Sequence, residues 1–402
     1  MTTLQHITSD ILYVGASEGR HPLFENIYPV PNGMSYNSYL ITDQKTALMD
    51  TCDTSVREQF LNNLKTGLTD RNLDYIVVHH MEPDHAALLD EILTLYPSAK
   101  VVCNTKTQTL IHQFFNRDIT SRILLVKEGD TLSLGRHTLS FYMAPMVHWP
   151  EVMVSYDSTD KILFSADAFG TFGELNGSLF ADSIDLVDFL PEARRYYTNI
   201  VGKYGNQVQM LLKKAATLDI QTLCPLHGPI WRQNLGWFLD KYQKWSTYTP
   251  EAPSVLIVFG SIYGHTEQTA RLLATHLAKQ GVTDIRLYDV SKIHPSYLVA
   301  ESFRSSHIVL ASVTYNNGLF PPMETFLSDL KAHALQNRHF YLIQNGSWAP
   351  VSGKVMTTLL AEMKNTTLDE TVVTLTSSLK PTQENEIISL AERIRQSMAY
   401  LS

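Results

Sequence analysis

The feature of this sequence that most restricts its fold and chemistry is a group of potential metal ligands directly after an apolar run. Residues 75–78 (Tyr-Ile-Val-Val) are typical of a buried strand, and residues 83–95 have an N-terminal proline and apolar residues at helical spacing. The loop that joins this strand to this helix carries His80, Glu82, Asp84 and His85. The first two project to one side of an extended chain and the last two enter the helix, so the loop suits two metal ions better than one.

Three further potential ligands each follow a predicted strand. The strands cover residues 138–143, 161–165 and 220–224, and the potential ligands are His148, Asp167 and His227. Each alone has an ordinary explanation, such as a turn capped by Asp167. Together with the first loop they supply four histidines and three carboxylates, which is enough for two metal sites that share a bridging carboxylate.

Length and composition exclude several classes of protein. A chain of 402 residues with 44% apolar residues predicts two globular domains. The net charge of -8 gives no support for nucleic acid or a membrane surface as a partner. The three cysteines are far apart, no segment is long and apolar enough to cross a bilayer, and the first ten residues do not resemble a signal peptide. The simplest expected location is a reducing cytoplasm.

The pattern of predicted elements changes at residues 245–253, which contain two prolines and show little periodicity. Before this segment we expect short strands in a meander, and a helix over residues 55–66 that Gly67 ends. After it, strands and helices alternate, as is typical of a doubly wound parallel sheet. We therefore expect a linker here between domains of residues 1–248 and 254–402.

The strand predicted at residues 255–259 leads through Gly-Ser-Ile-Tyr-Gly-His-Thr directly into a helix. Hydroxyl groups and free backbone N–H groups at a helix N-terminus form a cradle for phosphate. This S-x-Y-G-x-T loop resembles the phosphate loop of flavodoxins, and together with two later strand ends it resembles an FMN site. The absence of G-x-G-x-x-G argues against a dinucleotide site. The resemblance implies phosphate contacts from Ser261, Tyr263, Gly264, His265 and Thr266, and a further cofactor contact from Ile262 in the same loop. It implies ring contacts from Thr314, Tyr315, Asn316, Asn317, Gly318, Asn345, Gly346, Ser347 and Trp348.

A loop of the form H-x-E-x-D-H, followed by a distant His, Asp and His and then by a flavodoxin-like region, resembles the flavodiiron proteins, also called A-type flavoproteins. The resemblance covers nearly the whole chain and includes residues 36–40, 163–170 and 227–229. It implies an α/β chain with an N-terminal metallo-β-lactamase-like αββα sandwich, followed by a flavodoxin-like doubly wound parallel sheet. It also implies two non-haem irons, one held by His80, Glu82 and His148, the other by Asp84, His85 and His227, with Asp167 between them. The histidine that matches His85 is not always bound in this family, so its role stays open.

The same resemblance implies an enzyme that passes electrons through FMN to the diiron site and reduces dioxygen to water, nitric oxide to nitrous oxide, or both. It implies an external electron donor such as rubredoxin, since the chain lacks the cysteine pairs of a fused one. It further implies a head-to-tail homodimer, or a tetramer built from it, with Trp149 or Trp348 as interface aromatics. Tyr196 and Tyr197 are candidates for a hydroxyl near the substrate, although at least one is expected to be an ordinary helix aromatic.

Two other functions stay open from the sequence. A metallo-β-lactamase-type zinc hydrolase would typically read H-x-H-x-D-H, whereas Glu82 adds a hard carboxylate donor that suits oxidised iron better. A flavin electron carrier with an inactive metal domain is the second alternative. The sequence also does not decide between the two gases, because pocket residues such as His21 and Phe24 cannot be placed from it.

Overall fold

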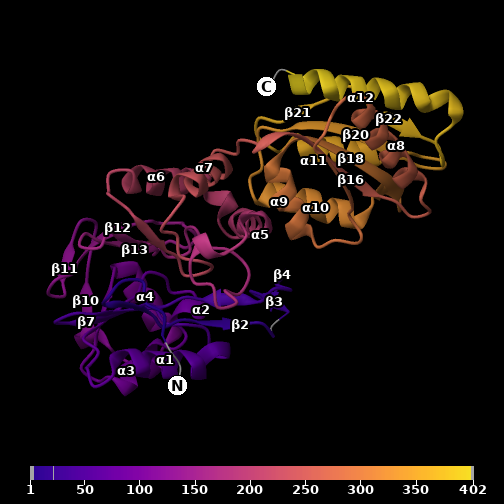
Figure 1. Ribbon diagram of the computed structural model, residues 1–402. Helices are drawn as coiled ribbons and strands as arrows, with labels where there is room; N and C mark the ends of the chain where they lie inside the picture. The colour runs from indigo at the N-terminus through magenta and orange to yellow at the C-terminus, as the bar shows by residue number, and fades with distance from the viewer. Residues whose placement is uncertain (1–3, 21, 400–402) are drawn as a thin grey trace. The chain divides into compact units, whose positions relative to one another are not determined.

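The computed structural model describes residues 4–20 and 22–399, so His21 lies outside the described residues. The chain divides into two compact units (Figure 1). The first unit comprises Met1–Tyr197 and Asn206–Gln243, and the second comprises Thr198–Gly205 and Lys244–Ser402. The short segment Thr198–Gly205 thus groups with the second unit, although the sequence placed it in the first domain. The domain boundaries at residues 248 and 254 stay a prediction.

The first unit is built on two sheets. The larger has the strand order β1 (Ile11–Tyr13), β6 (Tyr39–Thr42), β7 (Thr46–Met49), β8 (Tyr75–Val77), β9 (Lys100–Cys103) and β10 (Ile123–Leu125). The smaller runs β11 (Thr131–Ser133), β12 (Thr138–Met143), β13 (Met153–Asp157), β14 (Ile162–Phe164) and β15 (Thr222–Cys224). Two small ribbons pair β2 (Ala16–Glu18) with β5 (Met34–Tyr36), and β3 (Leu23–Phe24) with β4 (Tyr28–Pro29). The helices are α1 (Arg57–Leu68), α2 (Pro83–Ala86), α3 (Leu89–Leu95), α4 (Thr105–Phe114), α5 (Leu186–Tyr196), α6 (Gly205–Ala215) and α7 (Leu235–Ser246).

The inner faces of the two sheets share one apolar core. Ile41 and Val77 from the larger sheet pack in the same buried cluster as Phe141 and Phe164 from the smaller sheet. Helices α1 and α3 lie on one side of this unit and α6 and α7 on the other (Figure 1). The predicted αββα sandwich is therefore confirmed.

Two details of the predicted helices in this unit are wrong. Helix α1 does not end at Gly67 but continues to Leu68. A Cβ atom at position 67 would lie 2.9 Å from Cδ2 of Leu40, so the glycine allows the helix to approach β6 closely. The ligand helix is also not continuous, because Leu88 leaves helical geometry and separates α2 from α3.

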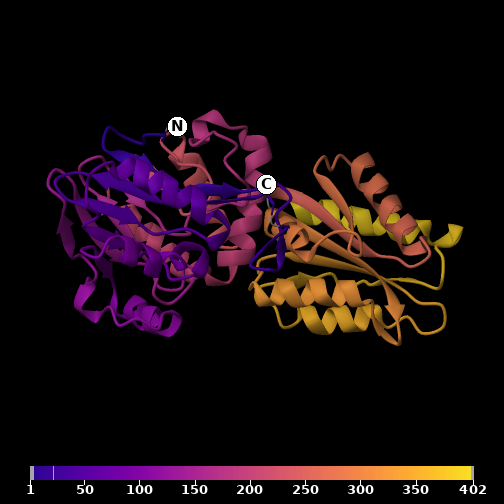
Figure 2. The same ribbon diagram turned by 90° about the horizontal axis from the view of Figure 1, so that it is seen from below.

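The second unit is a mainly parallel sheet between two layers of helices. Its strand order is β17 (Ile285–Asp289), β16 (Ala252–Gly260), β18 (Ser305–Tyr315), β20 (His339–Asn345) and β21 (Thr367–Leu368), with β22 (Val373–Leu375) also on β20 and β19 (Gly318–Leu319) antiparallel to β18. Helices α8 (His265–Lys279) and α12 (Glu384–Ala399) pack together on one face, and α9 (Pro295–Arg304), α10 (Pro321–Ala332) and α11 (Ser352–Leu360) cover the other (Figure 2). The predicted flavodoxin-like sheet is confirmed. No helix in the described parts of the two units is long and apolar enough to cross a membrane.

A buried arginine holds several chain segments of the second unit together. Arg338 is 1% exposed and donates from Nε to the carbonyl oxygen of Ser302 at 2.9 Å, from Nη1 to that of Tyr248 at 2.6 Å, and from Nη2 to that of Phe303 at 2.5 Å. Arg338→Met keeps an apolar stem but leaves these carbonyl groups without their donor, so we expect the unit to lose about 3 kcal/mol of stability. Urea unfolding measures this loss, and the exposed Lys354→Met is the matched control. Equal stability of both variants would contradict the prediction.

A stacked histidine pair is expected to make the second unit less stable in acid. The rings of His307 and His339 lie 4.9 Å apart at 12°, and burial together with His339 lowers the pKa of His307 to about 4. An unfolded histidine takes a proton at about pH 6.5, so stability is complete above that pH and falls as the pH drops towards 4. We expect a loss of about 2 kcal/mol between about pH 7 and about pH 5, and a smaller loss in His307→Gln. Unfolding curves at both pH values test this, and identical losses in the two proteins would refute it.

Candidate metal centre and flavin pocket

All seven predicted ligands come from strand-end segments of the first unit. His80 and Glu82 follow β8, and α2 adds Asp84 and His85. His148 lies between β12 and β13, Asp167 follows β14, and His227 follows β15. The structure brings all seven together in two groups, each with ligand atoms within 4.8 Å of one another.

The first group consists of His80, Glu82, His148 and Asp167. Oε2 of Glu82 lies 3.1 Å from Nε2 of His80 and 3.0 Å from Nε2 of His148. Oδ2 of Asp167 lies 3.2 Å from each of the same two ring nitrogens. Two imidazole nitrogens and two carboxylate oxygens thus face one point.

The second group consists of Asp84, His85 and His227. Oδ2 of Asp84 lies 3.4 Å from Nε2 of His85 and 3.2 Å from Nε2 of His227. The other carboxylate oxygen of Asp167, Oδ1, lies 3.1 Å from Nε2 of His85 and 3.7 Å from that of His227. Asp167 therefore turns one oxygen towards each group, as a bridging ligand requires.

Many of the donor atoms of the two groups are buried and lack hydrogen-bond partners. In the described residues, this holds for both carboxylate oxygens of Asp84 and of Asp167, both ring nitrogens of His85, and Nε2 of His148. Burial opposes charge on the histidines, but the carboxylates of Asp84 and Asp167 outweigh it and raise the pKa of His85 to about 9. A pocket of unpartnered nitrogen and oxygen donors that attracts positive charge fits a pair of metal cations.

Several residues that the sequence did not identify hold these ligands in place. Oε1 of Glu151 accepts from Nδ1 of His80 at 2.8 Å, and the backbone oxygen of Ser35 accepts from Nδ1 of His227 at 2.6 Å. Oδ1 of Asp50 accepts from the backbone N–H of His79 at 2.7 Å. The contacts of Glu151 and Ser35 leave Nε2 of His80 and of His227 facing the other ligands, and the contact of Asp50 holds the backbone beside His80.

The loop that carries His227 is anchored by a distant segment. Nδ2 of Asn37 donates to the carbonyl oxygens of Pro225 and Gly228, both at 2.8 Å. Gly228 has φ +79° and a Cβ atom there would lie 2.2 Å from Cγ2 of Thr171, so only glycine fits. The resemblance had marked both residues 36–40 and the His-Gly-Pro motif, but the sequence did not show that Asn37 holds this loop.

The two candidate tyrosines have different surroundings. The ring of Tyr196 lies 5.5 Å from that of His227, and burial together with Asp167 raises its pKa, so the hydroxyl keeps its proton. Within the described chain this hydroxyl has no hydrogen-bond partner. The ring of Tyr197 instead packs against Tyr242 at 5.0 Å. Tyr196 is therefore the one that contacts a candidate ligand.

Two residues of the β3–β4 ribbon adjoin the metal ligands. The ring of Phe24 lies 5.5 Å from that of His227. Glu25 has φ 49° in the turn, and loss of hydration together with the nearby Glu82 carboxylate raises its pKa to about 8. Nothing in the sequence pattern singles out Glu25, because its proximity to Glu82 depends on how this ribbon folds back.

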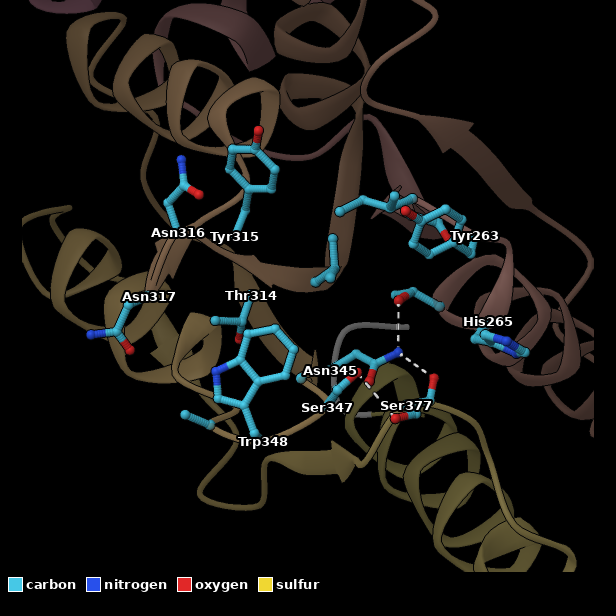
Figure 3. Close-up of a pocket in the computed structure, with 16 residues that line it drawn as sticks. Tyr263, His265, Thr314, Tyr315, Asn316, Asn317, Asn345, Ser347, Trp348 and Ser377 are labelled. Carbon is cyan, nitrogen blue, oxygen red and sulfur yellow. Dashed lines mark hydrogen bonds between the residues drawn. The ribbon is translucent and has the colours of Figure 1, made fainter.

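In the second unit, a cavity of about 590 Å³ opens at the carboxyl ends of the central strands (Figure 3). Oγ of Ser261 accepts from the N–H of Gly264 at 3.1 Å and closes the turn before α8. Nδ2 of Asn345 donates to Oγ1 of Thr266 at 3.2 Å and to the carbonyl oxygen of Ser377 at 3.0 Å. A helix N-terminus with two hydroxyl groups beside it fits a phosphate group.

Most predicted flavin residues line this cavity. They are Ser261, Ile262, Tyr263, His265, Thr266, Thr314, Tyr315, Asn316, Asn317, Asn345, Gly346, Ser347 and Trp348. Gly264 and Gly318, which were also predicted, do not line it: Gly264 supplies the turn at φ +88°, and Gly318 pairs with Tyr315. Val313, Ala349 and Ser377 line it but were not predicted. Tyr263 and Trp348 are 89% and 93% exposed, so the cavity has an aromatic rim.

Comparison with known proteins gives consistent results. Residues 34–228 match the model of the ODP family beta lactamase. The chain is 32% identical to the nitric oxide reductase of Moorella thermoacetica over 81% of each chain, and 30% identical to the rubredoxin-oxygen oxidoreductase of Megalodesulfovibrio gigas over 87% of each. The solved rubredoxin oxygen:oxidoreductase from Desulfovibrio gigas superimposes with a TM-score of 0.91 at 28% identity, covering 99% of both chains. The flavodiiron protein from Giardia intestinalis has the same fold, with a TM-score of 0.92, 24% identity and coverage of 100% of this chain and 98% of that one.

These relatives extend over both units, and their likeness agrees with the grouped ligands of the first unit and the cavity of the second. The candidate ligand groups and the strand-end cavity are formed mostly by residues that the sequence resemblance named, and their roles stay a prediction. The chain therefore belongs to the flavodiiron proteins and is an oxidoreductase.

Proposed function

We propose that this protein uses electrons passed through FMN to a non-haem diiron centre to reduce dioxygen to water, nitric oxide to nitrous oxide, or both. The observation that carries the proposal is the position of Asp167, with one carboxylate oxygen towards each of two buried donor groups. The names of the relatives in Moorella and Megalodesulfovibrio support the two gases as substrates.

The seven candidate ligands would form two iron positions. His80, Glu82 and His148 would hold one, Asp84, His85 and His227 the other, and Asp167 would bridge them. The bound irons would supply open coordination positions and electrons, and FMN would supply storage for electrons. Phe24 and Tyr196 pack against His227 and keep bulk water from that side of the centre.

Tyr196 is the residue we assign to the substrate side. Its hydroxyl holds a proton at Oη, because burial and the carboxylates of Asp167 and Asp84 raise its pKa. Because this hydroxyl is protonated, it can donate a hydrogen bond to a substrate oxygen. Both proposed reactions also consume protons, which a group on the substrate side can help to deliver. We propose Tyr197 as a packing residue.

In the second unit, Ser261, Thr266 and the N-terminus of α8 would bind the FMN phosphate. Thr314, Asn345 and Trp348 would contact the ring. We further propose residues 1–248 and 254–402 as the metal and flavin domains, and a reducing cytoplasm as the location, supported by three buried free cysteines. An external donor such as rubredoxin is supported by the name of the Megalodesulfovibrio relative.

Metal and flavin analysis of the purified protein tests the cofactors. We expect about two irons and about one FMN per chain. Stoichiometric zinc without flavin, from cells grown with ample iron, would instead indicate a hydrolase, and FMN without iron would indicate an electron carrier. Steady-state consumption of each gas with a common reductant then decides between dioxygen and nitric oxide.

A further inference from the structure

The two donor groups differ in the acceptor that the second ring nitrogen of a histidine hydrogen-bonds to. In the first group, Nδ1 of His80 donates to Oε1 of Glu151 at 2.8 Å. In the second group, Nδ1 of His227 donates to the backbone carbonyl oxygen of Ser35 at 2.6 Å. The partner of His80 thus carries a full negative charge, whereas the partner of His227 is a neutral peptide group with only a dipole.

Glu151 is built into its position. It is 1% exposed, and Oε1 also accepts from the backbone N–H of Met81 at 2.9 Å. Nδ2 of Asn104 donates to the backbone oxygen of Glu151 at 2.6 Å. In the described residues, Oε2 has no hydrogen-bond partner and Glu151 pairs with no lysine or arginine. In the described residues its charge is therefore fixed near His80 and is not neutralised by a lysine or an arginine.

The carboxylates within the two groups are matched in number. Each group has one carboxylate of its own, Glu82 or Asp84, and Asp167 turns an oxygen towards each. Among the described residues, Glu151 is the carboxylate outside the two groups that hydrogen-bonds to the ring of a candidate ligand. A carboxylate hydrogen-bonded to the outer nitrogen of a metal-bound histidine makes that histidine a stronger donor and favours the more oxidised metal.

We propose that Glu151 makes the metal position formed by His80, Glu82 and His148 the harder one to reduce, so that the first electron resides at the position formed by Asp84, His85 and His227. Glu151 is a positioning residue, because it acts through His80. The proposal rests on the proposed diiron centre. Each step adds one electron to one ferric ion and breaks no bond, and dithionite is the reductant in the test.

The test is a redox titration of the full-length, iron-loaded protein, followed by electron paramagnetic resonance. For the wild type we expect two separate one-electron steps with a mixed-valence signal between them. Glu151→Gln keeps the shape of the side chain but removes its charge. In this variant the lower of the two reduction potentials should rise, while the higher one stays the same. The difference between the two potentials then decreases, and the mixed-valence signal becomes weaker. Glu151→Asp keeps the charge and should resemble the wild type, as should Glu362→Gln, which removes an exposed carboxylate of the second unit.

Iron release to a chelator provides a second readout. In Glu151→Gln one iron should leave about tenfold faster than in the wild type, and the other at the same rate. Three results would overturn the assignment of Glu151. They are an equal shift of both reduction potentials, a shift of the higher potential alone, and no change in either the potentials or the rates of iron release. A wild-type protein that contains no iron would instead overturn the proposed function, so the two failures are distinguishable.

Discussion

Replacing Asp167 with alanine is expected to remove metal from both positions and to lower gas consumption at least about a thousandfold. The reason is geometric, because Asp167 is the carboxylate that turns an oxygen towards each donor group. Without it, the positive charges of two metal ions would be held close together with no anionic bridge between them. Iron content per chain and steady-state gas consumption measure the effect.

The matched control is Asp157→Ala in the same sheet. Asp157 is also buried, and its Oδ2 pairs with Nδ1 of His137 at 2.9 Å, away from the candidate ligands. We expect this variant to be less stable but to retain both irons. An Asp167→Ala protein that still binds two irons would show that Asp167 is not the bridge.

The second large effect is expected from Thr266→Asp in the flavin cavity. Thr266 is buried beside Asn345 in the first turn of α8, where the FMN phosphate is proposed to bind. A carboxylate there repels the phosphate, so FMN affinity should fall at least about a hundredfold. Thr266→Ser keeps the hydroxyl and should retain FMN. The flavin released by denaturation measures the content of each protein, and full FMN content in Thr266→Asp would place the phosphate elsewhere.

These two variants together test the head-to-tail dimer that the sequence resemblance implies. In a mixed dimer of Asp167→Ala and Thr266→Asp chains, one intact flavin site would face one intact metal centre across the interface. Activity should therefore return after subunit exchange. If mass measurement confirms that the subunits have exchanged but no activity returns, electron transfer between the chains is excluded.

The grouping of the seven candidate ligands could be predicted because their signal is local. Four ligand-type residues in the loop after β8 are a dense pattern, and the other three each follow a strand end, where loops assemble sites. Glu151 could not be predicted, because its role depends on reaching His80, which is 71 residues earlier in the chain. The local sequence, an isolated glutamate after a proline, is equally typical of an exposed surface residue.

The fold shows the same division between local and tertiary information. Helix α8 was predicted, whereas no helix was predicted over the residues of α9. Most residues of α9 are buried, including the polar Ser296, Glu301 and Ser302, and this burial depends on the packed unit rather than on the local sequence. Gly67 looked like a helix end because its actual role, close contact with Leu40, exists only in the folded protein.

The anchoring of the His227 loop by Asn37 has a consequence for the order in which the protein matures. During synthesis, every donor of the first group has left the ribosome once Asp167 has emerged, but the second group is incomplete until His227 follows. Asn37 must then wait for residues 225–228 before its amide finds both carbonyl partners. Because a domain generally folds as a unit, the first unit can reach its final form only after His227 and its anchor have been made, so both donor groups are completed late and together.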